Sequence, residues 1–89
     1  RVKRGKVLQI AERHGVTSVR VFGSVARGEE TAESDVDLLV TIQAKTSSWF
    51  PAGLILDLEA LLGRHVNIVT ESGLNLLLKQ QVLSEAVPI

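Results

Sequence analysis

Hydrophobic and polar residues follow two periods along this chain, and each period predicts a different kind of element. Apolar residues at a helical spacing predict three helices, over residues 2–14, 51–62 and 74–86. Strict alternation of apolar and polar residues predicts three strands, over residues 17–22, 36–40 and 65–70. A short helical turn starting at Ser24 adds a fourth helix. Strands separated by helices predict an α/β fold: a small mixed sheet of about three strands flanked by about four helices, which cover one face.

The length and composition fit one folded domain, residues 1–89. A chain of 89 residues leaves no room for a second domain, and 45% apolar with 22% charged residues is typical of a globular protein. No apolar run approaches the roughly 20 residues that span a bilayer, and the start of the chain has no apolar signal-peptide core. We therefore expect a cytoplasmic protein without a membrane partner.

Charge and residue types argue against several functions. Ten basic and ten acidic residues cancel, and aromatic residues make up only 3% of the chain, so nucleic acid is not expected as a partner. The basic cluster within residues 1–6 is expected to be a solvated helix face rather than a phosphate-binding arm. Cysteine is absent, so any metal must be bound by oxygen or imidazole, which favours a hard cation.

Two aspartates, Asp35 and Asp37, lie at the start of the strand predicted over residues 36–40. Side chains alternate along a strand, so both carboxylates point to the same face. Held about 5 Å apart, they repel by about 3 kcal/mol at an effective dielectric of about 20. A Mg²⁺ ion bound between the two carboxylates makes the net interaction attractive. Mg²⁺ is usually shared between one or two carboxylates and substrate phosphates. The pair is a candidate metal site, although acidic residues also protect edge strands from pairing.

The turn before the aspartates, Gly23 and Ser24, is a candidate phosphate site. Glycine lets the backbone approach a phosphate closely, and Ser24 can present its amide and hydroxyl at the start of a helical turn. Arg27 could add a forked donor. The spacing from Gly23 to Gly28 is that of a P-loop, but Glu29 stands where the phosphate-binding lysine belongs, which excludes a P-loop. A plain turn is the alternative reading.

The stretch GSVARGEETAESDVD, residues 23–37, combines these two features as G-S, ten residues and D-x-D. It matches the signature of the DNA polymerase beta superfamily of nucleotidyltransferases, with Gly23, Ser24, Asp35 and Asp37 at the signature positions. The flanking segments RVFGSVARGE and SDVDLLV resemble the minimal nucleotidyltransferases, which are antitoxin partners of HEPN-domain ribonuclease toxins. The resemblance covers nearly the whole chain in the order of its elements.

The resemblance implies a nucleotidyltransferase core and a Mg²⁺-dependent transfer of AMP from ATP. In such a family one or two Mg²⁺ ions bridge Asp35, Asp37 and the triphosphate, while Gly23 and Ser24 fix the phosphates. An acceptor hydroxyl then attacks the α-phosphorus as pyrophosphate departs. The implied acceptor lies on a HEPN-type toxin, which would be silenced within a hetero-oligomeric toxin–antitoxin pair. ATP as the substrate is likewise implied by the resemblance.

The chain departs from this family on the strand predicted over residues 65–70. Members usually carry a third acidic residue there, and the corresponding position is Asn67. An amide oxygen can coordinate a metal, but it brings no negative charge. Three explanations remain: a slow enzyme that uses Asn67 as a neutral ligand, a domain that binds nucleotide and partner without turnover, or Glu71 as the source of the missing charge.

Two function classes follow from this departure. The first is an enzyme that transfers AMP to the toxin, and the second is a module that neutralises the same partner by binding alone. Transfer to a small molecule such as an aminoglycoside is less favoured because the chain has no further domain to form an acceptor pocket.

The last predicted helix is apolar on more than one side. We expect part of it to complete the core, through Leu77, Leu78 and Val82. A subunit interface and a place in the core are equally good interpretations of three other residues, Leu76, Leu83 and Trp49.

Overall fold

A computed structural model describes residues 3–29, 31, 33–43, 46 and 50–89. Every helix and strand that the sequence predicts is present, with ends that shift by a few residues. The elements, in chain order, are α1 (Arg4–Arg13), β1 (Val16–Phe22), α2 (Gly23–Arg27), β2 (Val36–Ile42), α3 (Ala52–Leu62), β3 (Val66–Thr70), the 3₁₀ turn η1 (Glu71–Gly73), α4 (Leu76–Glu85) and β4 (Val87–Pro88). None of these helices is long and apolar enough to span a membrane in the described part of the chain.

The four strands form one mixed sheet in the order β3-β2-β1-β4. β1 runs antiparallel to β2 and to β4, whereas β2 and β3 are parallel. The α/β class is therefore confirmed, with one strand more than predicted. β4 has only two residues, one of them Pro88, so no alternation was available to predict it.

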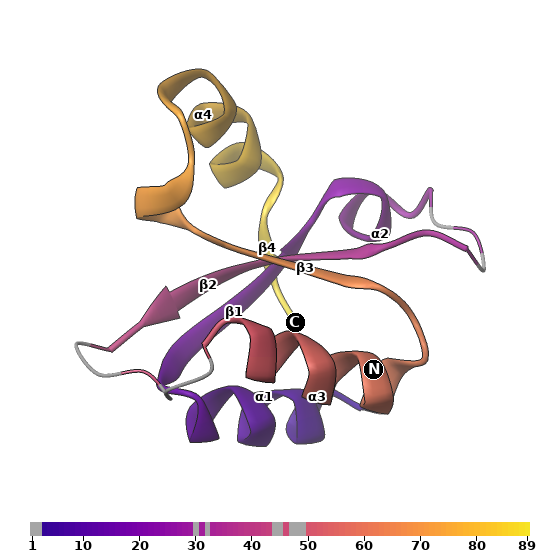
Figure 1. Ribbon diagram of the computed structural model, residues 1–89. Helices are drawn as coiled ribbons and strands as arrows, with labels where there is room; N and C mark the ends of the chain where they lie inside the picture. Colours follow the sequence, from indigo (N-terminus) through magenta and orange to yellow (C-terminus); the bar gives the residue numbers. More distant parts are fainter. Residues whose placement is uncertain (1–2, 30, 32, 44–45, 47–49) are drawn as a thin grey trace.

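The core lies between one face of the sheet and the pair α1 and α3, which lie side by side beneath it (Figure 1). β2 contributes Leu38 and Val40 to this core, and α3 contributes Leu54 and Leu58, each at most 2% exposed. His14 Nε2, at the end of α1, lies 2.8 Å from Asp57 Oδ2 and joins α1 to α3. This packing leaves the other face of β2 to carry the candidate site.

The expectation that helices cover only one face is wrong. α4 lies on the side of the sheet opposite α1 and α3, at the top of the view in Figure 1. Leu39 points away from the main core, yet it is completely buried. η1 contacts β2 on the way to α4, so the far face is covered around Leu39 and stays accessible near the start of β2.

The prediction that Leu77 and Leu78 belong to the core is also wrong. They are 89% and 50% exposed, and only Val82 of the predicted set is buried. Leu76, 83% exposed, was one of the interface candidates. Residues 76–78 are consecutive and therefore extend over about 200° of the helix circumference, whereas one thin layer buries only one side of α4. Trp49 lies outside the described residues.

Candidate active site

Neighbouring strands bring the candidate residues into one row across the sheet. β2 lies between β1 and β3, and its Asp37 is paired with Phe22 on one side and Asn67 on the other. Leu38 faces the core, so Asp37 and Asp35 point to the opposite face. Asp35 is exposed and Asp37 is half-buried. The alternation of β2 therefore places both carboxylates beside one another on an accessible part of the sheet.

Asn67 lies directly against the two aspartates. Its Nδ2 donates to Asp37 Oδ1 at 2.9 Å and, more weakly, to Asp35 Oδ2 at 3.4 Å. This amide partly offsets the repulsion between the carboxylates and draws them toward one point. The position that corresponds to the third acidic residue is therefore part of the same cluster, as a neutral side chain.

Glu71 does not join this cluster. It lies in η1, beyond the end of β3, and its Oε1 accepts a hydrogen bond from Arg20 Nη2 at 2.7 Å. The explanation in which Glu71 supplies the missing negative charge therefore finds no support in the geometry. Arg20, on the same face of β1 as Phe22, is the cation that holds η1 to the sheet. The alternation of β1 already placed Arg20 on that face, but its partner could not be read from the sequence.

Gly23 brings the Gly-Ser turn into contact with the aspartates. Its φ is +72°, a left-handed conformation that residues with a Cβ adopt only at a cost. A Cβ at this position would also collide with Asp37 Oδ2 and lie 3.3 Å from Asp37 Cγ. Two features therefore favour glycine at this position: the left-handed backbone conformation and the Asp37 carboxylate packed against it. The two halves of the motif, separated by ten residues along the chain, meet at this contact.

Ser24 lies in the first turn of α2, directly after this contact, and is half-buried. The first N–H groups of a helix have no acceptor within the helix, so they can bind an anion. The α2 start and the aspartates therefore offer hydrogen-bond donors and acidic oxygens next to one another. A triphosphate with its metal ions needs both.

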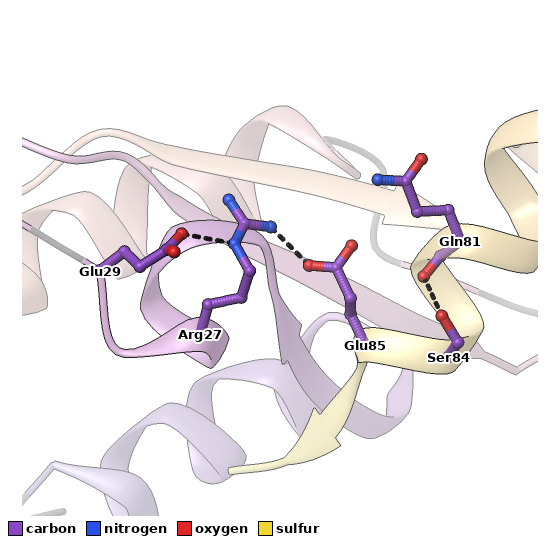
Figure 2. Close-up of polar contacts among 5 residues, drawn as sticks. All are labelled: Arg27, Glu29, Gln81, Ser84 and Glu85. Atoms are coloured by element: carbon purple, nitrogen blue, oxygen red, sulfur yellow. Dashed lines mark hydrogen bonds and ion pairs between the residues drawn. The ribbon is translucent and has the colours of Figure 1, made fainter.

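Arg27, the predicted forked donor, ends α2 and is held between two carboxylates (Figure 2). Its Nε donates to Glu29 Oε1 at 2.7 Å and its Nη1 donates to Glu85 Oε1 at 2.5 Å. Side-chain hydrogen bonds to Glu29 and then to Glu85 raise the pKa of Arg27 above its usual value. The guanidinium lies one helical turn after Ser24, and its role toward phosphate stays a prediction.

The donor set fits Mg²⁺ held together with a nucleotide better than it fits a metal held by protein alone. No group of three or more acidic, histidine or cysteine side chains that could hold a metal occurs among the described residues. Asp35 and Asp37 supply two carboxylates. Asn67 can supply an amide oxygen if its side-chain amide rotates by about 180°, which exchanges Nδ2 and Oδ1. Mg²⁺ ordinarily completes its shell with water and substrate phosphates, so this incomplete set suits a site that loads with nucleotide.

Known proteins share the sequence and the fold of this chain. Residues 4–89 match the model of the nucleotidyltransferase domain family. The protein adenylyltransferase MntA of Thermococcus cleftensis is 42% identical over 79 residues, which is 89% of this chain and 80% of that protein. A solved structure assigned as a minimal nucleotidyltransferase is 50% identical, with a TM-score of 0.86 over 99% of this chain and 90% of the other.

A toxin–antitoxin structure solved with AMP-PNP shares the fold at 21% identity, with a TM-score of 0.80 over 96% of this chain and 70% of that chain. The family model covers all but three residues of the chain, and two relatives exceed 40% identity. The chain therefore belongs to the nucleotidyltransferase domain family, and its resemblance to the minimal nucleotidyltransferases is confirmed.

Proposed function

We propose that this protein transfers AMP from ATP to a hydroxyl group of a HEPN-type toxin and silences the toxin by this modification. The observation that carries the proposal is the packing of Gly23 against Asp37, which joins a phosphate-binding turn to a pair of carboxylates. The name of the Thermococcus relative, a protein adenylyltransferase, supports AMP transfer to protein. The toxin–antitoxin structure with AMP-PNP supports both an adenine nucleotide and a toxin partner.

Each residue has a defined task in this proposal. The backbone at Gly23 and the amide and hydroxyl of Ser24 would hold the triphosphate, with Arg27 as a further donor. Asp35 and Asp37 would hold one or two Mg²⁺ ions, with Asn67 as a neutral ligand. The metal would supply charge neutralisation on the phosphates. The acceptor hydroxyl would then attack the α-phosphorus. Its oxygen forms a bond to phosphorus, its proton passes to water, and the bond from phosphorus to pyrophosphate, in line with the attack, breaks.

A second candidate is a binding module that neutralises the same toxin without turnover. Two observations favour it: the third acidic position is the neutral Asn67, and α4 exposes three consecutive leucines, residues 76–78. Large exposed apolar side chains that adjoin one another commonly mark a protein interface. The two candidates share a partner and differ only in whether AMP is transferred.

One experiment separates the two candidates. The protein is mixed with ATP, Mg²⁺ and the product of the neighbouring gene as the candidate toxin, and that partner is examined by intact mass spectrometry. A mass gain of one adenylyl group, lost when ATP or Mg²⁺ is omitted, supports transfer. Inhibition of the partner's ribonuclease activity without any adduct supports the binding module. If the partner shows neither an adduct nor inhibition, both candidates are refuted.

Replacing Asn67 with Asp should raise the rate of AMP transfer about tenfold, because a third carboxylate strengthens the hold on Mg²⁺. The same change removes the amide donor to Asp37 and adds repulsion, so the melting temperature should fall without Mg²⁺ and recover with it. Thermal melts across a Mg²⁺ titration and the adduct rate measure the two effects.

Asn75→Asp is the matched control for this substitution. Asn75 caps α4 by accepting from Leu78 N, a role that aspartate also fills, so the control adds the same charge away from the site. Equal Mg²⁺ responses in Asn67→Asp and Asn75→Asp would show that residue 67 does not face the metal.

Replacing Leu77 with Glu should weaken binding to the toxin about tenfold or more if the exposed leucines contact it. Leu77 is 89% exposed, so the free energy of unfolding should change by no more than about 0.5 kcal/mol. Leu56→Glu is the control, because Leu56 is 66% exposed on α3, in the layer on the other side of the sheet. Equal toxin affinity in the two variants would place the interface elsewhere.

A further inference from the structure

The contact between Arg27 and Glu85 joins two helices that are far apart in the sequence. Glu85 is the last residue of α4, and 58 positions separate it from Arg27. The Glu85 side chain is 21% exposed, against 64% for Glu29, the other partner of this guanidinium. Water screens exposed ion pairs, so the contact with Glu85 is the less screened of the two.

α2 depends on such outside contacts for its orientation. It has five residues, and a helix of that length has too few internal hydrogen bonds to hold itself in place. Its first residue, Gly23, packs against Asp37, and its last residue, Arg27, is tied to α4. The phosphate-binding turn is thus held at one end by β2 and at the other by α4.

The two carboxylates also determine how the guanidinium points. Nε and Nη1 are engaged, and Figure 2 draws no bond from the remaining nitrogen, Nη2. Among the residues that the structure describes, no acceptor lies on Nη2. A planar guanidinium held at two nitrogens loses little further freedom when its third nitrogen binds an anion.

We propose that Glu85 is a positioning residue for nucleotide binding: it orients Arg27 toward the phosphates and holds α2, with the Gly-Ser turn, in its binding position. The inference rests on the proposed function, because it assumes that a nucleoside triphosphate binds at this turn. Glu85 itself touches neither phosphate nor metal, and it acts only through Arg27.

The test is a double-mutant cycle on the affinity for a non-hydrolysable ATP analogue with Mg²⁺, measured by calorimetry. Glu85→Ala should weaken binding about fivefold and Arg27→Ala about tenfold or more. The double variant should bind no more weakly than Arg27→Ala alone, because Glu85 has no task left once Arg27 is gone. Glu85→Gln, which keeps an acceptor oxygen at the same reach, should restore most of the affinity.

Glu12→Ala is the matched control, because Glu12 is an exposed glutamate of α1 with no bond to Arg27. The Glu12→Ala variant should bind the ATP analogue with wild-type affinity. Wild-type affinity or tighter binding in Glu85→Ala overturns the inference. The inference is also overturned if Glu85→Ala weakens analogue binding by the same factor in the Arg27→Ala background as in the wild type. Glu85 would then affect binding independently of Arg27, through the stability of the fold. Failure of the wild type itself to bind the analogue refutes the proposed function instead.

Discussion

Replacing Asp37 with Asn should reduce AMP transfer about a thousandfold or more. Asp37 is the carboxylate that both Asn67 and the Gly23 turn contact, so it is the centre of the cluster. Loss of its charge removes several kcal/mol of transition-state stabilisation by the metal, and each 1.4 kcal/mol corresponds to a factor of ten. The initial rate of adduct formation on the toxin, followed by intact mass, measures the effect.

The fold should tolerate this change. Asp37→Asn relieves repulsion with Asp35, so the melting temperature without Mg²⁺ should stay the same or rise. Asp35→Asn should have a smaller effect on transfer, because Asp35 is exposed and lies farther from the amide of Asn67. Asp57→Asn, on α3, is the matched control and should transfer AMP at the wild-type rate. An Asp37→Asn protein that keeps more than about a tenth of the activity would contradict the assigned role of Asp37.

Replacing Gly23 with Ala should reduce AMP transfer about a hundredfold, because the new methyl group displaces the Asp37 carboxylate from its place beside the turn. Displacement of a reacting or binding group by about 1 Å is enough for such a loss. The positive φ adds a second cost of about 1–2 kcal/mol to the free energy of unfolding. Denaturant unfolding and the adduct rate measure the two effects separately.

Gly28→Ala separates the backbone effect from the collision. Gly28 has a φ of +73°, almost that of Gly23, but no atom lies within 4 Å of the position of its Cβ. Both variants should therefore lose similar stability, and only Gly23→Ala should lose transfer. Equal loss of transfer in both would show that strain in α2, rather than contact with Asp37, accounts for the defect.

The hydrophobic periods were sufficient to predict most of the fold. Alternation along residues 36–40 placed Val36, Leu38 and Val40 on one face, and it thereby directed Asp35 and Asp37 to the other, as the structure has them. β4 was missed because two residues carry no period. The error on Leu77 and Leu78 has a different cause: α4 is apolar on several sides, and period alone does not show which side faces the sheet.

The candidate site was predicted to a similar degree. The spacing of the motif named Gly23, Ser24, Asp35 and Asp37, and the family resemblance pointed to Asn67 as the position of the usual third acidic residue. The structure confirms that Gly23, Asp35, Asp37 and Asn67 lie together. Arg27 was named as a donor, but its attachment to Glu85 was beyond prediction, since nothing in the local pattern of either residue indicates the other.

The sequence by itself determined the elements of this protein, the faces of its strands and the residue types of the site, because these depend on neighbours within a few positions. Only the tertiary structure decided which elements meet: Gly23 against Asp37, Asn67 between two carboxylates, and α4 on the far face with Glu85 on Arg27. Such contacts depend on how separate elements pack together, and the same local pattern is compatible with several ways of packing.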